Sequence, residues 1–201
     1  MPNMYLNQNT LKIEETGTVE FQGDGRVWDD LQVAVSNARL PASSAPTWTT
    51  YDFGIGSGIA FNVLGFGVGE YYDFYLQTSH SMQLNTVLDN HIHWTIPTNS
   101  ASDQFQFQLD VIAASIGSAF AVPTGSPFTV EKTLSGAEAG KHNYLELADI
   151  PAANTTVSSI YICRLTRIAA TANEYGSDVY ILFNDSHYIK DTVGSRTETA
   201  K

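Results

Sequence analysis

The sequence predicts an all-β fold, namely an antiparallel β-sandwich of jelly-roll type with about eight to ten strands and extended terminal arms. Two observations lead to this prediction. Apolar and polar residues alternate with a period of two along much of the chain, whereas the periodicity of an amphipathic helix is scarce. The apolar segments also follow one another at intervals of about 8 to 15 residues with no helical pattern between them, which favours antiparallel strands over β-α-β units.

Each predicted strand lies between turn-forming clusters of Gly, Pro, Asn and Ser. The clearest strand covers 105–111, where Phe105, Phe107 and Leu109 share one face and the intervening glutamines share the other. Segments 113–121 and 145–150 alternate less regularly, and either could form a short helical turn. In chain order, strands are predicted at 18–21, 31–35, 59–64, 71–76, 90–96, 105–111, 128–132, 159–165 and 178–183.

A chain of 201 residues is long enough for one sizeable β domain. We predict an N-terminal arm at 1–17, a single β-sandwich domain at 18–190 and a C-terminal tail at 191–201. The two terminal segments lack alternation, and such segments often become ordered on contact with a neighbour. The apolar side chains of the arm are therefore candidates for an anchor to another protein: Tyr5, Leu6, Leu11 and Ile13.

The formal net charge of −11 argues against binding to nucleic acid or to an anionic membrane. The N-terminus has neither the basic segment nor the apolar segment of a secretory signal. The single cysteine, Cys163, lies in an apolar strand-like run, which is typical of a reduced thiol in a core. We therefore expect no nucleic-acid partner, no membrane and folding in a reducing cytoplasm.

His91 and His93 stand one residue apart in the sequence DNHIHWTIP. In a strand these two side chains share one face, while Ile92 and Trp94 face the core. The first interpretation is that the imidazoles form hydrogen bonds on a half-buried sheet face, with no metal and no cofactor. A metal site needs a third ligand from elsewhere in the chain or from other subunits around an axis. The candidates within the chain are His80, His142, His187, Asp89 and Asp185.

Signatures of catalysis are weak in this sequence. It has no G-x-S-x-G motif of a nucleophile elbow, and its neighbouring carboxylates lie at turns or strand ends, where solvated roles are usual. The glycines between 54 and 69 lack the strand, helix and acidic residue of a dinucleotide-binding motif. We therefore expect no cofactor and no enzymatic activity. Tyr71, Tyr72 and Tyr75 are candidate stacking residues for a glycan, although aromatic residues are common in strands in any case.

A series of short motifs extends from Val27 to Arg196: W-D-D-L, Q-x-x-H, H-x-H-W, S-S-x-x-x-C-R-L and H-Y-x-x-D-T-x-G-S-R. Their order resembles that of a family of virion structural proteins of tailed bacteriophages. One departure is the sequence QTSH at 77–80, where an apolar residue and a proline are expected before the histidine.

The resemblance implies a non-enzymatic virion protein that is assembled in the cytoplasm of the bacterial host. We expect a homotrimeric capsid-decoration or head-associated protein whose partners are copies of itself and the major capsid protein or other virion proteins. Two alternatives remain. One is a receptor- or glycan-binding module of a phage tail or fibre. The other is a cupin-like metal-binding protein, although the cupin motif continues from H-x-H to a nearby glutamate that is missing here.

Overall fold

The structure is a computed structural model that describes 4–7 (backbone only), 11–13, 17–53, 56, 58–151 and 156–198. These residues form thirteen strands and two short 3-10 helices, η1 (Gly23–Gly25) and η2 (Val35–Asn37). The strands are β1 (Met4–Asn7), β2 (Leu11–Ile13), β3 (Val19–Phe21), β4 (Val27–Ala34), β5 (Thr47–Tyr51), β6 (Phe61–Phe66), β7 (Tyr71–Gln77), β8 (Leu88–Thr95), β9 (Ala101–Ala114), β10 (Phe128–Ser135), β11 (Asn143–Ile150), β12 (Ile160–Ile168) and β13 (Val179–Lys190).

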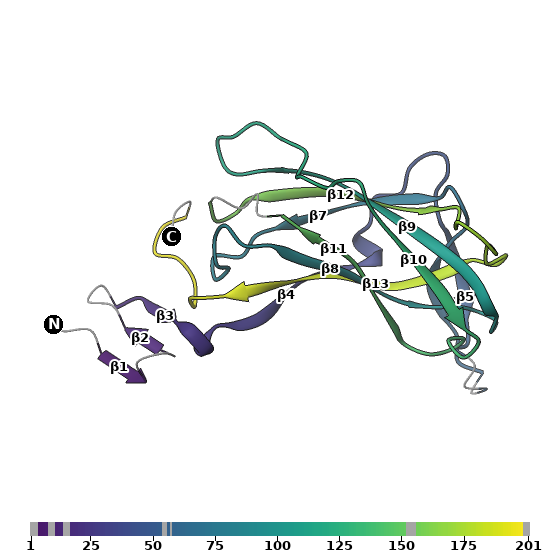
Figure 1. Cartoon of the computed structure of the whole chain (residues 1–201), viewed down its shortest axis with the longest axis horizontal. Helices are drawn as coiled ribbons and strands as arrows, with labels where there is room; N and C mark the ends of the chain where they lie inside the picture. Colours follow the sequence, from purple (N-terminus) through teal and green to yellow (C-terminus); the bar gives the residue numbers. More distant parts are fainter. Residues whose placement is uncertain are drawn as a thin grey trace.

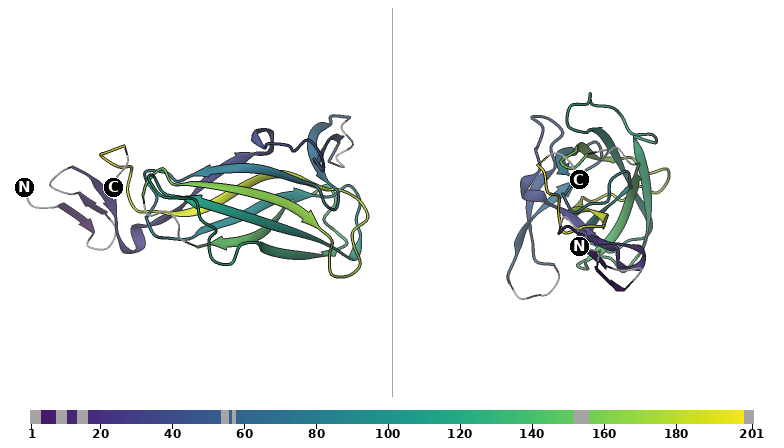
Figure 2. Two further views of the ribbon diagram at one scale, coloured as in Figure 1. Left: turned by 90° about the horizontal axis from the view of Figure 1, so that it is seen from above. Right: turned by 90° about the vertical axis from the view of Figure 1, so that its left-hand side faces the viewer.

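The strand pairing confirms the predicted antiparallel jelly roll. Strand β6 pairs with β13, β7 with β12, β8 with β11, and β9 with β10, all antiparallel, so that the chain forms one long ribbon folded on itself. The ribbon wraps into two packed sheets (Figures 1 and 2), with the orders β10-β9-β12-β7 and β11-β8-β13-β6-β5. Strand β4 joins the second sheet by pairing with β13 beyond β6.

The core lies between the two sheets, where the alternation of the sequence places it. Phe105 and Phe107 of β9 are fully buried, while the neighbouring glutamines face outward. Trp94 of the opposite sheet contacts Phe105 edge to face, with ring centroids 4.8 Å apart. Cys163 is buried in the same core, as predicted, and burial raises the pKa of its thiol. Edge-to-face aromatic contacts of this kind stabilise the packing of one sheet on the other.

The structure differs from the sequence prediction in three internal places. Strand β5 was not predicted, and it pairs with β6 at the edge of the larger sheet. The segment 145–150 belongs to strand β11 and not to a helical turn. The segment 113–121 contains the end of β9 and a return that hydrogen-bonds back to it through Ala113 and Ala121, again without a helix. In each case tertiary pairing determines the local structure.

The terminal segments lie together at one end of the sandwich (Figure 1). Strands β1, β2 and β3 form a small antiparallel sheet, so the described parts of the N-terminal arm are paired strands. The backbone N–H of Phe21 donates to the carbonyl of Asp191, and Arg196 Nε donates to Thr18 Oγ1 at 2.9 Å. Of the anchor candidates, Leu11 and Ile13 are half-buried, while the side chains of Tyr5 and Leu6 lie outside the described residues.

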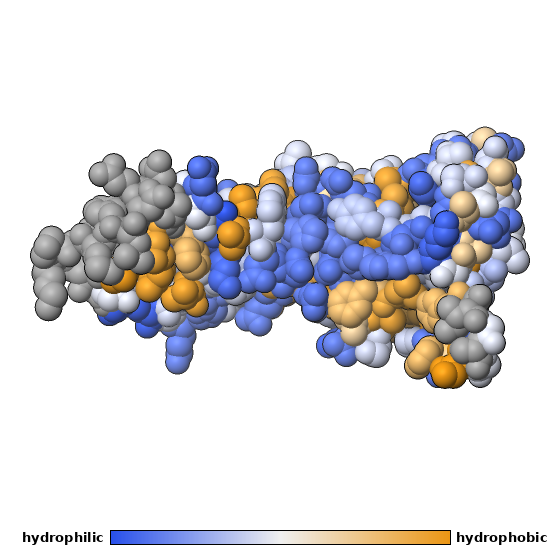
Figure 3. Space-filling view, turned by 90° about the horizontal axis from the view of Figure 1, so that it is seen from below, coloured by the Kyte–Doolittle hydropathy of each residue, from blue (hydrophilic) through white to orange (hydrophobic). Residues whose placement is uncertain are grey.

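The surface is polar over most of the face in Figure 3, with hydrophobic side chains gathered near the β5–β6 hairpin at one end and at the other end of the molecule, near the N-terminus. The exposed large apolar side chains of this hairpin region are Trp48, Ile59 and Phe61. In the part of the chain that the structure describes, no helix is long and apolar enough to cross a membrane.

Candidate metal centre

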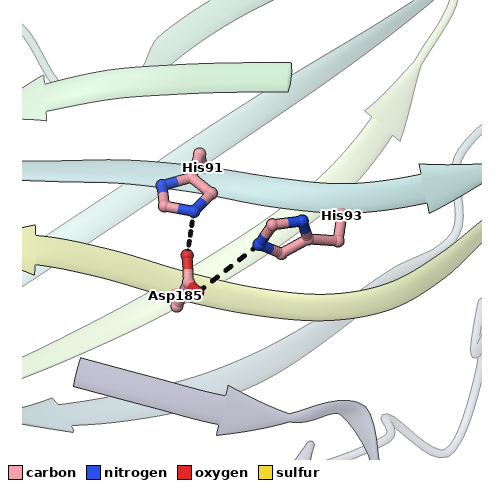
Figure 4. A group of neighbouring side chains, drawn as sticks. All are labelled: His91, His93 and Asp185. Atoms are coloured by element: carbon pink, nitrogen blue, oxygen red, sulfur yellow. Dashed lines mark ion pairs between the residues drawn. The ribbon is translucent and has the colours of Figure 1, made fainter. Parts of the chain in front are cut away.

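His91, His93 and Asp185 meet on the outer face of the larger sheet. His91 and His93 come from β8, and their side chains point away from the core, while Ile92 and Trp94 are fully buried inside. The neighbouring strand β13 supplies Asp185, which lies directly opposite His91 in the register. Both imidazoles point toward its carboxylate (Figure 4). The prediction that the two histidines share one face is therefore confirmed.

A β-bulge at Leu182 is the reason that Asp185 faces the histidines. Before the bulge Val179 and Ile181 point into the core, and after it the even-numbered residues Asn184 and Ser186 do so. The extra residue shifts the alternation by one position. As a result, Asp185 and His187 lie on the outer face.

The donor atoms of His91, His93 and Asp185 all lie within 4.8 Å of one another. His91 Nε2 contacts Asp185 Oδ1, and His93 Nε2 lies 3.5 Å from Asp185 Oδ2. The side chain of His91 is 1% exposed and that of Asp185 is 6% exposed, whereas that of His93 is 23% exposed. Two imidazole nitrogens and a carboxylate oxygen form a donor set used for Zn²⁺ and for other divalent first-row metals.

A second layer of side chains holds these three residues in place. His93 Nδ1 lies 2.7 Å from His142 Nε2, a distance at which one ring donates a hydrogen bond to the other. The ring of His187 packs against that of His91, with centroids 4.3 Å apart. His187 Nε2 in turn lies 3.2 Å from Asp30 Oδ1. Partners of this kind fix the orientation of metal-binding imidazoles.

The protonation states also suit a cation. Burial pushes the pKa of Asp185 up, but hydrogen bonds and charges from His91 and His93 more than offset it, so the pKa lies below its usual value. Burial lowers the pKa of His93, which keeps a lone pair available for a metal. Burial, followed by repulsion from carboxylates including Asp89 and Glu146, raises the pKa of Tyr144 to about 12. The carboxylates around the cluster thus give it a negative electrostatic potential, which favours a positive ion.

One buried polar atom of the cluster, His91 Nδ1, lacks a hydrogen-bond partner among the described residues. Buried polar atoms without partners are uncommon, and an ion is one explanation for such an atom. Beside the cluster lies an open hollow of about 400 Å³ that reaches His93 and Asp185. The hollow is lined by Gln32, His93, His142, Leu182, Phe183 and Asp185.

A second group, Asp89, Glu146 and Asp149, lies on the same face, and its carboxylate oxygens are also within 4.8 Å of one another. Glu146 and Asp149 are exposed. Exposed carboxylates often gather without an ion, so we assign none to this group.

The other candidate residues are distributed as follows. His80 lies away from the cluster, with its ring nitrogens near Ser195 Oγ and Ser158 Oγ. That several chains share one ion through both histidines stays a prediction; within one chain the side chain of His91 is 1% exposed. Within the same chain, Asp185 is the residue that could supply a third ligand. Asp185 lies on strand β13. Strand β8 itself contains no counterpart of the glutamate that follows H-x-H in the cupin motif.

Tyr72 is also corrected as a glycan candidate, because its side chain is 1% exposed and packs in the core against Phe66. Adjacent residues of a strand face opposite sides. Tyr71 and Tyr75 therefore lie together on the outer face of the smaller sheet, and Tyr75 is exposed there.

No family model matches this chain, and no curated protein matches it. Among solved structures, TmCBM61 in complex with beta-1,4-galactotriose is similar with 12% identity and a TM-score of 0.26, over 82% of this chain and 88% of that chain. A structure of carbohydrate-binding modules from the beta-sandwich superfamily is similar with 8% identity and a TM-score of 0.34, over 88% of this chain and 71% of that chain. Similarity at this level gives no information about what the chain binds.

Proposed function

We propose that this chain is a metal-binding structural protein of a tailed-phage particle, in which the ion stabilises the sandwich and carries out no reaction. The observation that carries the metal-binding role is the convergence of His91, His93 and Asp185, whose donor atoms lie within 4.8 Å of one another on two adjacent strands. An ion held by all three would tie β8 to β13, the two central strands of the larger sheet.

The ion is a divalent first-row transition metal, and Zn²⁺ is our first choice. Imidazole nitrogen suits zinc, whereas Mg²⁺ and Ca²⁺ prefer sites made of oxygen ligands alone. With three protein ligands, a tetrahedral ion would keep one further position. Water can fill that position.

The phage role rests on the motif series. Three of its motifs lie on neighbouring strands in the order β8, β13 and β4. H-x-H-W supplies His91 and His93, and W-D-D-L supplies Asp30, while Asp185 lies just before H-Y-x-x-D-T. Part of the pattern that resembles the phage family thus surrounds the candidate metal centre. Within the particle, we propose that the chain forms a homotrimer that decorates the capsid and contacts the coat protein.

Elemental analysis of the purified full chain tests the metal-binding role. After dialysis against Zn²⁺ and removal of free metal, we expect about one ion per chain for the unmodified protein. The variants His91→Ala and Asp185→Asn should lose most of it. The variant His80→Ala is the matched control, since it removes a histidine outside the cluster, and it should keep the ion. Less than about a tenth of an ion per chain in the unmodified protein would rule out the metal centre.

Gel densitometry of purified particles tests the virion role separately. A copy number in the hundreds per particle would support capsid decoration, whereas a dozen or fewer would indicate a neck, tail or fibre position. Absence of the chain from purified particles would contradict the virion role and leave the metal centre unaffected.

A further inference from the structure

A second hollow lies on the opposite side of the molecule, on the outer face of the β10-β9-β12-β7 sheet. Its volume is about 500 Å³. Strands β7, β9 and β12 form the floor, and the segment that follows β9 forms one wall with Val122 and Pro127. This hollow shares no residue with the candidate metal centre.

Hydrogen bonds to β9 hold the wall in place. Ala113 and Ala121 exchange two backbone hydrogen bonds of 2.9 Å. The backbone N–H of Val111 donates to Ser126 Oγ at 3.0 Å. Because the same strand forms the floor and holds the wall, the hollow is present before any ligand arrives. A ligand that enters it does not bear the cost of ordering the wall.

A charged row crosses the floor. Asp73, Arg164 and Asp110 are register partners on three adjacent strands. Arg164 donates two hydrogen bonds to Asp73, from Nε at 2.7 Å and from Nη2 at 3.0 Å. Asp110 accepts one from Gln108 Nε2 at 3.0 Å. A ligand would find hydrogen-bond acceptors in the carboxylates of this row and donors in its guanidinium. The positions of these groups are already fixed.

The next row along the strands is apolar. Tyr75, Ile162 and Ile112 are register partners beside the charged row and share its face. Ile112 is 37% exposed, and Val122 on the wall is exposed as well. Tyr75 is 43% exposed and lies beside the hollow, with the guanidinium of Arg39 4.5 Å from the centroid of its ring. Same-face residues of a strand lie about 6.6 Å apart, so a ligand of the size of one sugar ring can contact both rows at once.

We propose that this hollow binds a neutral oligosaccharide. A sugar combines an apolar C–H face, which suits the row of Tyr75, with hydroxyl groups that donate to Asp110 and accept from Arg164. A fully apolar ligand would bury the charged row without hydrogen bonds, which is unfavourable. The guanidinium of Arg39 over Tyr75 brings a second cation close to the two carboxylates, so selection against an anionic ligand rests on the net charge of −11.

Binding of the full-length chain to an array of neutral and sialylated oligosaccharides, followed by titration calorimetry with the best neutral ligand, tests the inference. We expect binding to neutral members only. The variants Asp110→Asn and Tyr75→Ala should each weaken it about tenfold, in line with the loss of a charged hydrogen bond or of a stacking surface. Gln106→Ala, on the same sheet face outside the hollow, should change the affinity less than about twofold.

Thermal melting of each variant verifies that it is folded, and having two different variants protects the test if one of them fails to fold. Three results would overturn the inference: no binding to any neutral oligosaccharide, preference for sialylated members, or an affinity unchanged in both hollow variants. Loss of sugar binding in His93→Ala with normal binding in Asp110→Asn would also overturn it, because the ligand would then lie on the metal face.

Discussion

Asp185 lies opposite His91 across strands β13 and β8, and an extra residue at Leu182 brings the two side chains to the same face. The pair joins the two strands at the centre of the larger sheet. A metal ion held there should therefore stabilise the whole sandwich. An ion that binds the folded state and not the unfolded state raises the free energy of unfolding.

The first prediction concerns the melting temperature. At a Zn²⁺ concentration of about 100 times the dissociation constant, the ion should stabilise the unmodified chain by about 2.7 kcal/mol. For a domain of this size that corresponds to a rise of about 5 to 11 °C. Scanning calorimetry with zinc and then with a chelator measures it. His91→Ala should show no rise, and His80→Ala should show the full rise; an equal rise in both would contradict the centre.

The second prediction concerns His142, which lies 2.7 Å from His93 Nδ1 and is not one of the three proposed ligands. The variant His142→Ala should bind the same number of ions with an affinity about 10 to 100 times lower, because His93 loses the partner that orients it. Competition with a chromogenic chelator gives the affinity. A drop to zero stoichiometry would mean that His142 is itself a ligand.

The sequence predicts most of the fold because buried strands carry a two-residue alternation. Strand β9 shows it most clearly, with Phe105 and Phe107 inside and the glutamines outside. Strand β5 lies at a sheet edge, and Trp48 remains exposed there. Since neither face of β5 is deeply buried, its sequence, TWTTY, carries no clear alternation.

Two of the three residues of the candidate site are predictable in the same way. The spacing of His91 and His93 is enough to place them together. Asp185 is different, because simple alternation from Val179 and Ile181 would direct it into the core. The bulge that reverses this depends on how β13 pairs with β8, which is a long-range property absent from the local sequence.

The third prediction concerns Arg167, whose side chain is 1% exposed. Its guanidinium donates to the carbonyls of Phe66, Ser177 and Tyr175 and to Glu174 Oε1, at 2.5 to 2.7 Å. Arg167→Leu should lower the free energy of unfolding by about 3 to 5 kcal/mol, because these acceptors lose their donor.

Urea unfolding measures the effect of Arg167→Leu, and Arg164→Gln provides the comparison. The Arg164 side chain is 46% exposed and pairs with Asp73 at the surface, so its loss should cost less than about 1 kcal/mol. A similar loss of unfolding free energy in the two variants would contradict the claim that the burial of Arg167 makes its hydrogen bonds more important for stability.

The fourth prediction concerns acid stability and Glu138, whose carboxylate accepts hydrogen bonds from the backbone N–H groups of Ser135, Gly136 and Ala137. Burial raises its pKa, but these hydrogen bonds outweigh burial and the pKa lies below its usual value. A lowered pKa in the folded state gives stability that is present above the unfolded value, about 4.3, and is lost as the pH falls through the folded value.

Glu138→Gln should therefore be less stable than the unmodified chain at pH 7, and the difference should shrink below about pH 4. Urea unfolding at several pH values measures it. A difference that stays constant across this range would show that the charge of Glu138 contributes nothing.

The last prediction concerns the N-terminal segment. Deletion of residues 1–17 removes β1 and β2 and leaves β3 joined to Asp191 by the hydrogen bond from Phe21. The hydrophobic core and the residues packed on it begin at Leu31, so the shortened chain should fold and keep its oligomeric state. If the apolar side chains of this segment anchor the protein, the shortened chain should no longer bind phage particles in a co-sedimentation assay. Undiminished binding by a folded, shortened chain would contradict the anchor and direct attention to the surface of the sandwich itself.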